Sequence, residues 1–296
     1  MDAAVIINPI AGKGAGGSEE NLARLALRQH GLSGTVMTTS GPGHARELAR
    51  GFVNKGTETI VAWGGDGTVN EVASEVVHHA AMLGIVPQGS GNGLARELGL
   101  PLQDPLSALE VALNGKPRWI DAGELGGHLF FNVAGVGLDA SMAAVFNSLP
   151  SRGFFQYLVA AFWEILKYKS KSYVVNSTDF KIKKTALVVV LANTLQYGNN
   201  ALIAPLARPD DGLLELVILP SLGPVSRLWQ ARRLFTGSVY RVPGVMMHSI
   251  RDLEIAGDGV ISFHVDGEVF AASNKLSARV HQKALQVRSG FQTLSL

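Results

Sequence analysis

Short apolar runs alternate with amphipathic stretches over the first part of the chain. The apolar runs predict strands at residues 3–8, 35–39, 59–63 and 83–89. The amphipathic stretches predict helices at residues 18–30, 45–54 and 69–79. Strands that alternate with helices are typical of βαβ units built around a parallel sheet. We therefore expect an α/β domain over residues 1–117.

After Asp121 the pattern changes to strand-like runs that are separated by turns. These runs lie at residues 128–134, 173–178, 179–183, 185–193, 213–219, 252–256, 260–265 and 278–282. Successive strands joined by turns predict antiparallel sheets. Two expected helices, at 154–168 and 225–235, interrupt them. We expect a β-sandwich domain over residues 118–286, and we expect the residues after 286 to pack back on the first domain.

Composition limits the class of protein. With 296 residues the chain suits two compact domains, because single cores stop growing near about 250–300 residues. Hydrophobic residues make up 47% and charged residues 17%, which excludes a disordered chain. A net charge of +2 argues against a nucleic-acid partner. With 0 cysteines, the chain has neither a disulfide framework nor a thiolate metal site.

The N-terminal segment predicts a cytoplasmic protein. Secretory signals begin with basic residues and a long apolar run, whereas this chain becomes rich in glycine and proline from Pro9 onwards. The longest apolar-rich segment, 154–168, is interrupted by Gln156 and Glu164. It is also shorter than the ~20 residues that a membrane-spanning helix needs. We expect no transmembrane segment.

A glycine-rich turn, Gly64–Thr68, follows the predicted strand that ends at Trp63 and precedes a predicted helix. Glycines let backbone N–H groups approach an anion closely, and the helix N-terminus adds positive charge, so the turn suits a polyphosphate. Asp66 would repel phosphate unless it lies near Mg²⁺ or a hydroxyl nucleophile. The alternative is a tight turn in which Asp66 is the helix N-cap.

Two further glycine loops follow predicted strands. Gly89-Ser90-Gly91-Asn92-Gly93 repeats the strand-loop-helix arrangement, and ligands of α/β sheets bind at this edge. The loop after the first strand contains Asn8, Gly12, Lys13 and Gly14. Its spacing is not that of a Walker A motif, which disfavours a P-loop NTPase. Lys13 alone is equally compatible with a solvated loop lysine.

Six segments occur in a characteristic order: IINPIAGKG, WGGDGTVNEV, PQGSGNGLAREL, FNVAGVGLDA, PLARPDDGLLELVIL and VDGE. This set resembles the diacylglycerol kinase catalytic family, which includes bacterial lipid kinases and sphingosine kinases, over nearly the whole chain. NAD kinases and phosphofructokinases share the GGDGT turn but not the later segments. The resemblance implies an ATP-dependent, Mg²⁺-requiring lipid kinase. It also implies an N-terminal Rossmann-like α/β domain, a C-terminal β-sandwich domain and an active site in the interdomain cleft.

The resemblance also implies residue roles. The nucleotide-binding residues would be Asn8, Thr39, Gly64, Gly65, Asp66, Gly67, Thr68, Val69, Asn70, Ser90 and Asn92. Glu268 would accept the proton of the lipid hydroxyl, and Asp66 is the second candidate for this catalytic role. The alternative for the segment around Glu268 is an ordinary hairpin turn, since Asp-Gly is a common turn pair.

A metal site is implied around Asp211. Its carboxylate and the backbone carbonyls of Arg208 and Leu213 would bind Mg²⁺, with Asp121 and Asp210 in support. Without the resemblance, a turn before the strand at 213–219 is the alternative. The chain departs from many bacterial members at Gly93, where they carry an acidic residue. Asp139 is then a candidate to contact the acceptor, with a structural role as the alternative.

Aromatic residues lie beside lysines in the middle of the chain. The aromatics are Phe154, Phe155, Tyr157, Phe162 and Trp163, and the lysines are Lys167, Lys169, Lys171, Lys181, Lys183 and Lys184. This combination suits a peripheral position at the inner membrane face. A core helix with solvated lysines is the alternative.

Two other functions stay open, a small-molecule kinase that resembles NAD kinase and a non-catalytic lipid-binding regulatory protein. The acceptor is also open, because diacylglycerol, phosphatidylglycerol, monoacylglycerol and sphingoid bases all offer a primary hydroxyl. The sequence does not determine the oligomeric state.

Overall fold

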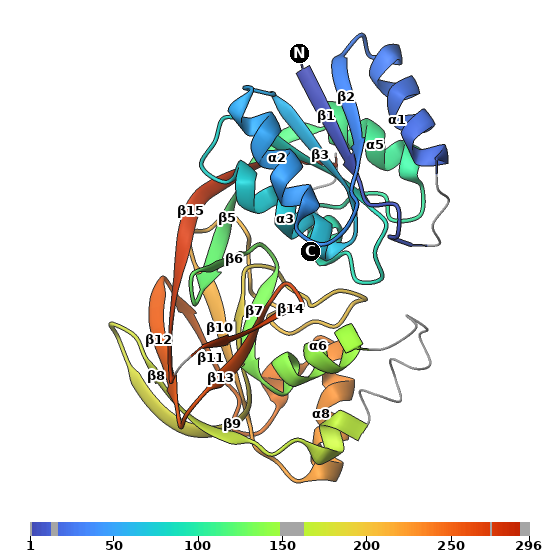
Figure 1. The fold of residues 1–296 in the computed structure, drawn as a ribbon. Helices are drawn as coiled ribbons and strands as arrows, with labels where there is room; N and C mark the ends of the chain where they lie inside the picture. The colour runs from blue at the N-terminus through green and yellow to red at the C-terminus, as the bar shows by residue number, and fades with distance from the viewer. Residues whose placement is uncertain (1, 13–16, 149–162, 273, 291–296) are drawn as a thin grey trace. The chain divides into compact units, whose positions relative to one another are not determined.

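The computed structural model describes residues 2–12, 17–148, 163–272 and 274–290 (Figure 1). Two compact units form, unit 1 with residues Met1–Ala122 and Gln282–Leu296, and unit 2 with residues Gly123–His281. The boundaries expected at 117 and 286 fall inside the strands β5 (Lys116–Leu125) and β15 (Lys275–Ser289). Because both strands continue from one unit into the other, no turn signal marks the actual boundaries.

Unit 1 is a parallel sheet with helices on both faces. Its strands are β1 (Asp2–Ile7), β2 (Ser33–Thr38), β3 (Thr59–Gly64) and β4 (Met82–Pro87). They lie in the order β4-β3-β1-β2, and the end of β15 pairs with β4. Its helices are α1 (Ser18–Gln29), α2 (His44–Asn54), α3 (Asp66–Val76), α4 (Gly93–Glu97) and α5 (Pro105–Asn114).

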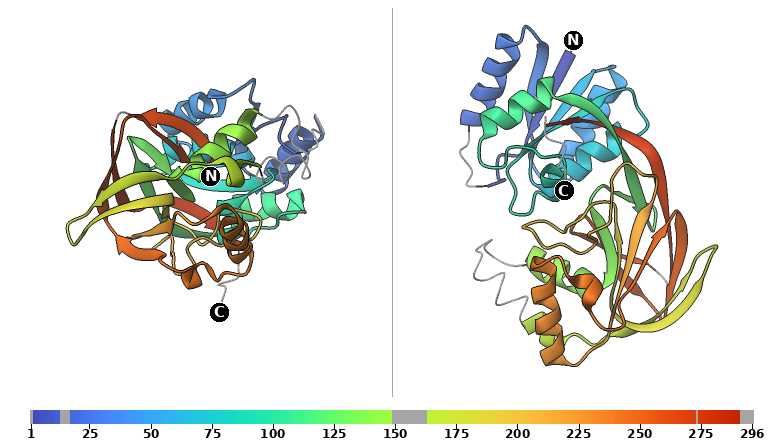
Figure 2. Two further views of the ribbon diagram at one scale, coloured as in Figure 1. Left: turned by 90° about the horizontal axis from the view of Figure 1, so that it is seen from below. Right: turned by 180° about the vertical axis from the view of Figure 1, so that it is seen from behind.

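The buried pattern of the strands explains this arrangement. Every residue of β3 is buried, as expected for a central parallel strand that is covered on both faces. The helices α2 and α3 pack together on one face, and α1 and α5 lie on the other (Figures 1 and 2). The expected α/β rhythm is confirmed, whereas α5 was not expected.

Unit 2 consists of antiparallel strands with a helical layer. Its strands are the end of β5, β6 (His128–Phe130), β7 (Val133–Gly137), β8 (Lys171–Asn176), β9 (Lys181–Ala192), β10 (Leu214–Pro220), β11 (Met246–Ile250), β12 (Asp252–Gly257), β13 (Ile261–Val265), β14 (Glu268–Ala272) and the start of β15. Its helices are α6 (Leu138–Ser148), α8 (Pro224–Phe235) and the 3₁₀-helix η1 (Val239–Arg241). Residues 163–167 are also helical.

The strand β9 organises the core of unit 2. It pairs with β8 over its first half and with β7 and β10 over its second half. Val189 and Leu191 pack into one apolar cluster with Phe130 and Phe263, whereas Val188 and Val190 pack into a second cluster on the opposite face. Both faces of β9 are thus buried, because alternate side chains of a strand point to opposite sides.

Several predictions for unit 2 need correction. The runs at 179–183 and 185–193 form one continuous strand, β9, because the polar Lys183–Thr185 segment pairs with β8 without a break. The helix expected at 225–235 is confirmed by α8. Residues 154–162 of the other expected helix lie outside the described residues, and β11, β14 and α6 were not expected. Within the described ranges, no helix has the length and apolar character needed to cross a membrane.

Candidate functional site

Three loops meet at the carboxyl edge of the sheet in unit 1. The parallel register places Ile7 of β1 beside Trp63 of β3, and Gly64 beside Pro87 of β4. The ladder continues into the loops, since the Asn8 N–H donates to the Trp63 carbonyl at 2.9 Å and the Gln88 N–H donates to the Gly64 carbonyl at 2.8 Å. The glycine loops that the sequence predicted therefore lie side by side.

The Asp66 carboxylate links two of these loops. Its Oδ2 accepts the Asn92 N–H and its Oδ1 accepts the Gly93 N–H, both at 2.8 Å. Asn92 is the N-cap residue of α4 and Gly93 is its first residue. The expected alternative, Asp66 as N-cap of its own helix, is wrong, because Gly65 is the N-cap residue of α3.

Burial raises the pKa of Asp66, and the hydrogen bonds from Asn92 and Gly93 partly offset this rise. The carboxylate thus lies in a desolvated position where its charge is unfavourable but its two oxygens have donors. The hydrogen bonds described for its side chain come from the loop that contains Asn92 and Gly93. A direct part of Asp66 in catalysis stays a prediction.

The close approach of the two loops requires glycine. A Cβ atom on Gly89 would lie 2.7 Å from the Cα of Gly65, and one on Gly64 would lie 2.6 Å from Oγ1 of Thr68. Thr68 in turn accepts a hydrogen bond from Nδ2 of Asn8 at 2.9 Å. The loop after β1 is thus joined to the Gly64–Thr68 turn. The backbone of this region is consequently bare of side chains, which suits the close approach of an anion.

The N-terminus of α3 lies beside these loops. Gly65 makes no side-chain cap, and the first N–H groups of any helix lack partners within the helix. These groups carry partial positive charge and point outward along the helix axis. The arrangement can bind an anion through the backbone.

The other predicted nucleotide residues differ in exposure. Gly67 and Ser90 are exposed, whereas Thr39, Thr68, Val69, Asn70 and Asn92 are buried. The Asn92 side chain closes its own loop, because its Oδ1 accepts the Gly89 N–H and its Nδ2 donates to the Gly89 carbonyl. Lys13 and Gly14 lie outside the described residues. Nucleotide contacts of all these residues stay predictions.

In unit 2, Glu268 follows a two-residue turn between β13 and β14. Asp266 and Gly267 have φ values of 47° and 88°, and Val265 pairs with Glu268. Two left-handed residues are the mark of the hairpin turn that matches the twist of a strand pair. The hairpin alternative thus describes the local fold, and this fold leaves the Glu268 side chain exposed.

The turn is fixed to the rest of unit 2 through Asp266. Its carboxylate accepts the N–H groups of Phe131, Asn132 and Val133 at 2.9, 3.0 and 3.1 Å. Its own N–H donates to the Val133 carbonyl at 2.9 Å. Glu268 therefore extends from a backbone that is held in place.

Asp139 lies in the first turn of α6 and is bound inside unit 2. Its Oδ1 accepts the Ala140 N–H at 2.8 Å, and its Oδ2 lies 3.1 Å from Nε2 of His264 and 3.4 Å from the Tyr197 hydroxyl. Burial, and then the Asp139 charge, raise the pKa of Tyr197 well above its usual value. These contacts fit the structural alternative, and a contact with the acceptor stays a prediction.

His264 and Tyr197 were not identified from the sequence. A signal existed for His264, since it is a polar residue between the apolar Phe263 and Val265, two residues before the Asp-Gly turn. Tyr197 offered none, because it lies in an irregular segment 58 residues from its partner.

Asp211 lies in an exposed turn before β10. Its Oδ1 accepts the Leu213 N–H at 3.0 Å, and Gly212 between them has a φ of 78°. Arg208, Asp210 and Asp211 are exposed. An exposed carboxylate with neighbouring carbonyls is a set of hard oxygen donors, which fits Mg²⁺.

The described residues contain no cluster of three His, Cys, Asp or Glu side chains suited to a metal. The Asp211 site would use only one carboxylate, so this finding does not bear on it. Asp121 is fully buried in unit 1, where its Oδ1 accepts the Lys283 N–H at 2.7 Å. Its support of the metal site stays a prediction.

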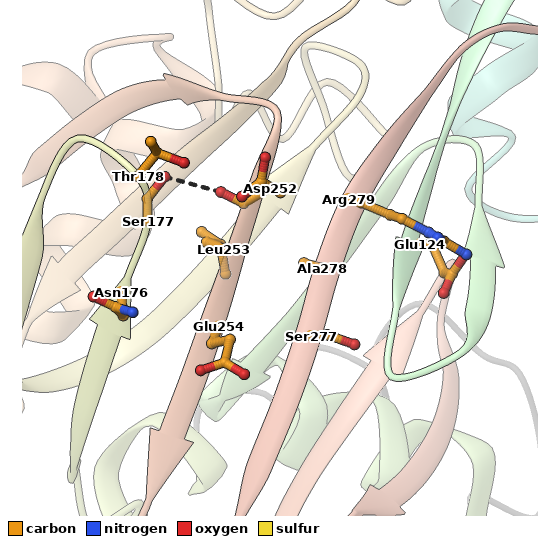
Figure 3. Close-up of a pocket in the computed structure, with 10 residues that line it drawn as sticks. All are labelled: Glu124, Asn176, Ser177, Thr178, Asp252, Leu253, Glu254, Ser277, Ala278 and Arg279. Atoms are coloured by element: carbon orange, nitrogen blue, oxygen red, sulfur yellow. Dashed lines mark hydrogen bonds and ion pairs between the residues drawn. The ribbon is translucent and has the colours of Figure 1, made fainter.

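A hollow of about 640 Å³ lies on the sheet of unit 2 (Figure 3). It is lined by Glu124, Asn176, Ser177, Thr178, Asp252, Leu253, Glu254, Ser277, Ala278 and Arg279. Burial alone would raise the pKa of Glu124, but hydrogen bonds from Arg279 and His281 lower it. The hollow contains none of the predicted catalytic or nucleotide residues, so it is separate from the candidate site.

The fold and the loops define a two-part protein, an α/β unit with an anion cradle and an antiparallel β unit. Residues 2–125 match the diacylglycerol kinase catalytic domain, and residues 132–289 match the YegS C-terminal NAD kinase beta sandwich-like domain. The chain belongs to this family of lipid kinases, in which YegS-like and diacylglycerol kinase proteins are grouped.

Individual proteins agree with this assignment. A "Probable lipid kinase YegS-like" protein of Pseudomonas aeruginosa is 33% identical over 225 residues, 75% of this chain and 74% of the relative. A "Diacylglycerol kinase" of Mycobacterium tuberculosis is 28% identical over 291 residues, 95% of this chain and 93% of the relative. A solved diacylglycerol kinase structure from Bacillus anthracis superposes with a TM-score of 0.73 at 16% identity. The matched region covers 98% of this chain and 97% of the chain in that structure. That similarity shows the shared fold.

Proposed function

We propose that this chain transfers the γ-phosphoryl group of ATP to a hydroxyl of a lipid such as diacylglycerol. One observation carries the proposal. Asp66 holds the second glycine loop against the first, so that Gly65 and Gly89 face each other without side chains at the N-terminus of α3. A backbone surface of this kind binds phosphates in many nucleotide sites.

Unit 1 would bind the nucleotide. The N–H groups at the start of α3, from Gly67 onwards, would contact the phosphates, with Thr39 and Ser90 nearby at the same sheet edge. Mg²⁺, when bound, supplies positive charge that offsets the charge of the phosphate oxygens. The residues themselves position the nucleotide and keep side chains out of its way.

Unit 2 would supply the proton acceptor. Phosphoryl transfer requires mainly positioning and charge neutralisation, and a carboxylate that accepts the hydroxyl proton assists it. Glu268 is exposed and follows a turn that Asp266 fixes through three hydrogen bonds. It can therefore reach a bound acceptor without first being released from another partner in the turn.

A lipid acceptor requires contact with a membrane surface, and unit 2 presents suitable side chains. Trp229 on α8 is 52% exposed and Trp163 is 53% exposed. The Arg233 guanidinium lies 3.8 Å from the centre of the Trp229 ring, and Lys167 Nζ lies 5.6 Å from that of Trp163. We call Trp163, Lys167, Trp229, Arg232 and Arg233 the aromatic-cationic surface.

The two parts of this surface lie side by side. The buried Arg227 of α8 donates hydrogen bonds to the carbonyls of Ile165 and Tyr168 at 3.2 and 2.6 Å. Aromatic rings with adjacent cations suit the headgroup region of an anionic membrane. This supports a cytoplasmic protein that binds peripherally to the inner membrane face.

A second candidate function is favoured by the match of unit 2 to a domain described as NAD kinase beta sandwich-like. One experiment tests both. The purified protein is incubated with labelled ATP and Mg²⁺, and either detergent-dispersed diacylglycerol, phosphatidylglycerol, monoacylglycerol and sphingoid base, or NAD. A phosphorylated lipid supports the proposal. Label in NAD alone would support the second function, and no product with either would favour a non-catalytic lipid-binding protein.

A further inference from the structure

His264 lies between Asp139 and the turn that carries Glu268. The residue is 3% exposed and is therefore shielded from water. One ring nitrogen, Nε2, lies 3.1 Å from Oδ2 of Asp139, and the other, Nδ1, lies 3.4 Å from the backbone nitrogen of Gly267. The ring thus bridges the first turn of α6 and the Asp266–Gly267 turn.

These two contacts determine where the proton of the ring lies. The Gly267 N–H is a donor, so Nδ1 must accept and carries no proton. The Asp139 carboxylate is an acceptor, so Nε2 must donate. The neutral form of His264 with its proton on Nε2 satisfies both partners, and neither of the other forms does.

The Asp139 carboxylate is itself fixed. Its other oxygen accepts the Ala140 N–H, and the Tyr197 hydroxyl also approaches Oδ2. The orientation of the His264 ring is thereby set from α6, because a carboxylate that accepts the N–H of a histidine ring fixes both the tautomer and the ring orientation.

We propose that His264 is a positioning residue that fixes the turn preceding Glu268, and that Asp139 acts through it. Asp266 holds one side of the turn through Phe131, Asn132 and Val133, and His264 holds the other through Gly267. With both sides held, the backbone at Glu268 has one position relative to β13. The inference rests on the proposed function in one respect, the assignment of Glu268 as proton acceptor.

Because Asp266 keeps its own contacts, loss of the His264 contact should loosen the turn without unfolding unit 2. A displacement of about 1 Å in a catalytic group lowers turnover by about 10²-fold. We therefore expect an effect on kcat with little change in the KM for ATP, because the nucleotide loops are on other elements.

Three substitutions separate positioning from simple packing. The amide oxygen of His264→Asn can occupy the place of Nδ1 and accept the Gly267 N–H. The amide of His264→Gln is one carbon further out, at the place of Nε2, and does not replace Nδ1 as an acceptor for the Gly267 N–H. His264→Leu keeps the volume but removes both contacts. We expect kcat to fall by up to about 10²-fold in the Gln and Leu variants and by much less in the Asn variant.

His281→Gln is the matched control. Nε2 of His281 also lies next to a carboxylate, 2.8 Å from Glu124, but this pair is on β5 and β15 rather than at the turn. The control should retain the kcat and KM of the unmodified protein. Equal kcat in the Asn, Gln and Leu variants, whether lowered or unchanged, would overturn the proposal, provided that their melting temperatures show folded protein.

A second measurement does not require activity. NMR spectra of protein with ¹⁵N-labelled histidine distinguish the two neutral tautomers, and the His264→Gln spectrum identifies the signal of His264. A proton on Nε2 at neutral pH supports the proposal, and a proton on Nδ1 or on both nitrogens overturns it. If the unmodified protein phosphorylates no lipid, the proposed function fails while the tautomer still decides whether His264 fixes the turn.

Discussion

Asp66 and Gly93 are joined by a 2.8 Å hydrogen bond from the Gly93 N–H to the Asp66 carboxylate. They are 27 residues apart in sequence and belong to different glycine loops. The bond, with its neighbour from Asn92, makes the two loops one structural unit. The link places the Asp66 carboxylate in a desolvated position, and burial raises its pKa.

The raised pKa of Asp66 predicts a pH dependence of stability. In the folded state the protonated form is favoured more than in the unfolded state, so the folded state binds more protons above pH 3.8. The free energy of unfolding therefore falls as pH rises from the unfolded pKa to the raised folded pKa, and is constant above it. Asp66→Asn lacks this titration.

The measurement is the melting temperature of both proteins from about pH 4 to about pH 7. The stability of the unmodified protein relative to Asp66→Asn should decrease as pH rises through this window. A relative stability that increases instead would show that the hydrogen bonds from Asn92 and Gly93 outweigh burial and lower the pKa. In that case, the carboxylate stabilises the loops at neutral pH.

The close approach of Gly65 and Gly89 predicts a loss of nucleotide binding on substitution. The new Cβ in Gly89→Ala would lie 2.7 Å from the Gly65 Cα and 2.9 Å from Oδ1 of Asn92, so the loops must separate. Gly65→Val acts on the same contact from the other loop. Isothermal calorimetry should show strongly weakened ATP binding for both variants.

Gly51→Ala is the control for these glycine substitutions. Gly51 lies in α2, and a Cβ atom there meets nothing within 4 Å. This variant should bind ATP normally and gain about 0.8–1.0 kcal/mol of helix stability. A folded Gly89→Ala protein with unchanged ATP affinity would contradict the assignment of these loops to the nucleotide.

The sequence predicted the elements that local patterns define. The apolar runs of β1, β3 and β4, each of which leads into a loop that contains glycine, identified the sheet edge where the loops meet. The helix α5 also has a local signal, since Asp104 accepts the Leu106 and Ser107 N–H groups as N-cap and Pro105 follows it. Local signals of this type can be found from sequence.

Contacts between distant residues could not be predicted in this way. The partner of Asp66 depends on how closely two loops approach, and the partner of His264 depends on a helix start 125 residues away. A pattern of neighbouring residues contains no such information. The division into units offers no local signal for a related reason, because β5 and β15 each continue from one unit into the other without a turn.

Substitution of Glu268 should lower turnover without weakening ATP binding. Glu268→Gln keeps the size and the exposed position of the side chain but removes the proton acceptor. Turnover should fall by ~10²–10⁴-fold, since this is the usual contribution of a general base. ATP binding, measured by calorimetry, should remain. Glu254→Gln, another exposed carboxylate of unit 2, is the control, and near-normal turnover in Glu268→Gln would shift the assignment to Asp66.

The aromatic-cationic surface predicts binding to anionic vesicles. Trp229→Ala combined with Arg232→Glu should reduce co-sedimentation with phosphatidylglycerol vesicles, because it removes an exposed ring and reverses a charge on α8. Activity on detergent-dispersed lipid should be retained. Trp119→Ala, which changes a tryptophan that is 44% exposed in unit 1, should bind vesicles normally. Equal vesicle binding by the unmodified protein and both variants would show that the aromatic-cationic surface does not bind the membrane.

Asp211 predicts a Mg²⁺ site that stabilises unit 2 without nucleotide. Its carboxylate lies in an exposed turn with the carbonyls of Arg208 and Leu213 close in sequence, and Mg²⁺ prefers such oxygen ligands. A metal that binds only the native state adds about 2.7 kcal/mol at a hundred times its dissociation constant. Mg²⁺ alone should therefore raise the melting temperature of the unmodified protein.

Asp211→Asn is the sharpest variant, because its amide oxygen can still accept the Leu213 N–H that Oδ1 of Asp211 accepts at 3.0 Å. The turn is thus kept while the charge is lost, and two carbonyls with a neutral amide bind Mg²⁺ poorly. The Mg²⁺-induced rise in melting temperature should disappear in Asp211→Asn and persist in Asp258→Asn, which changes another exposed aspartate of unit 2. Thermal denaturation of the three proteins with and without Mg²⁺, in the absence of ATP, makes the comparison. An equal rise in all three would mean that Asp211 is a turn residue and that Mg²⁺ binds elsewhere.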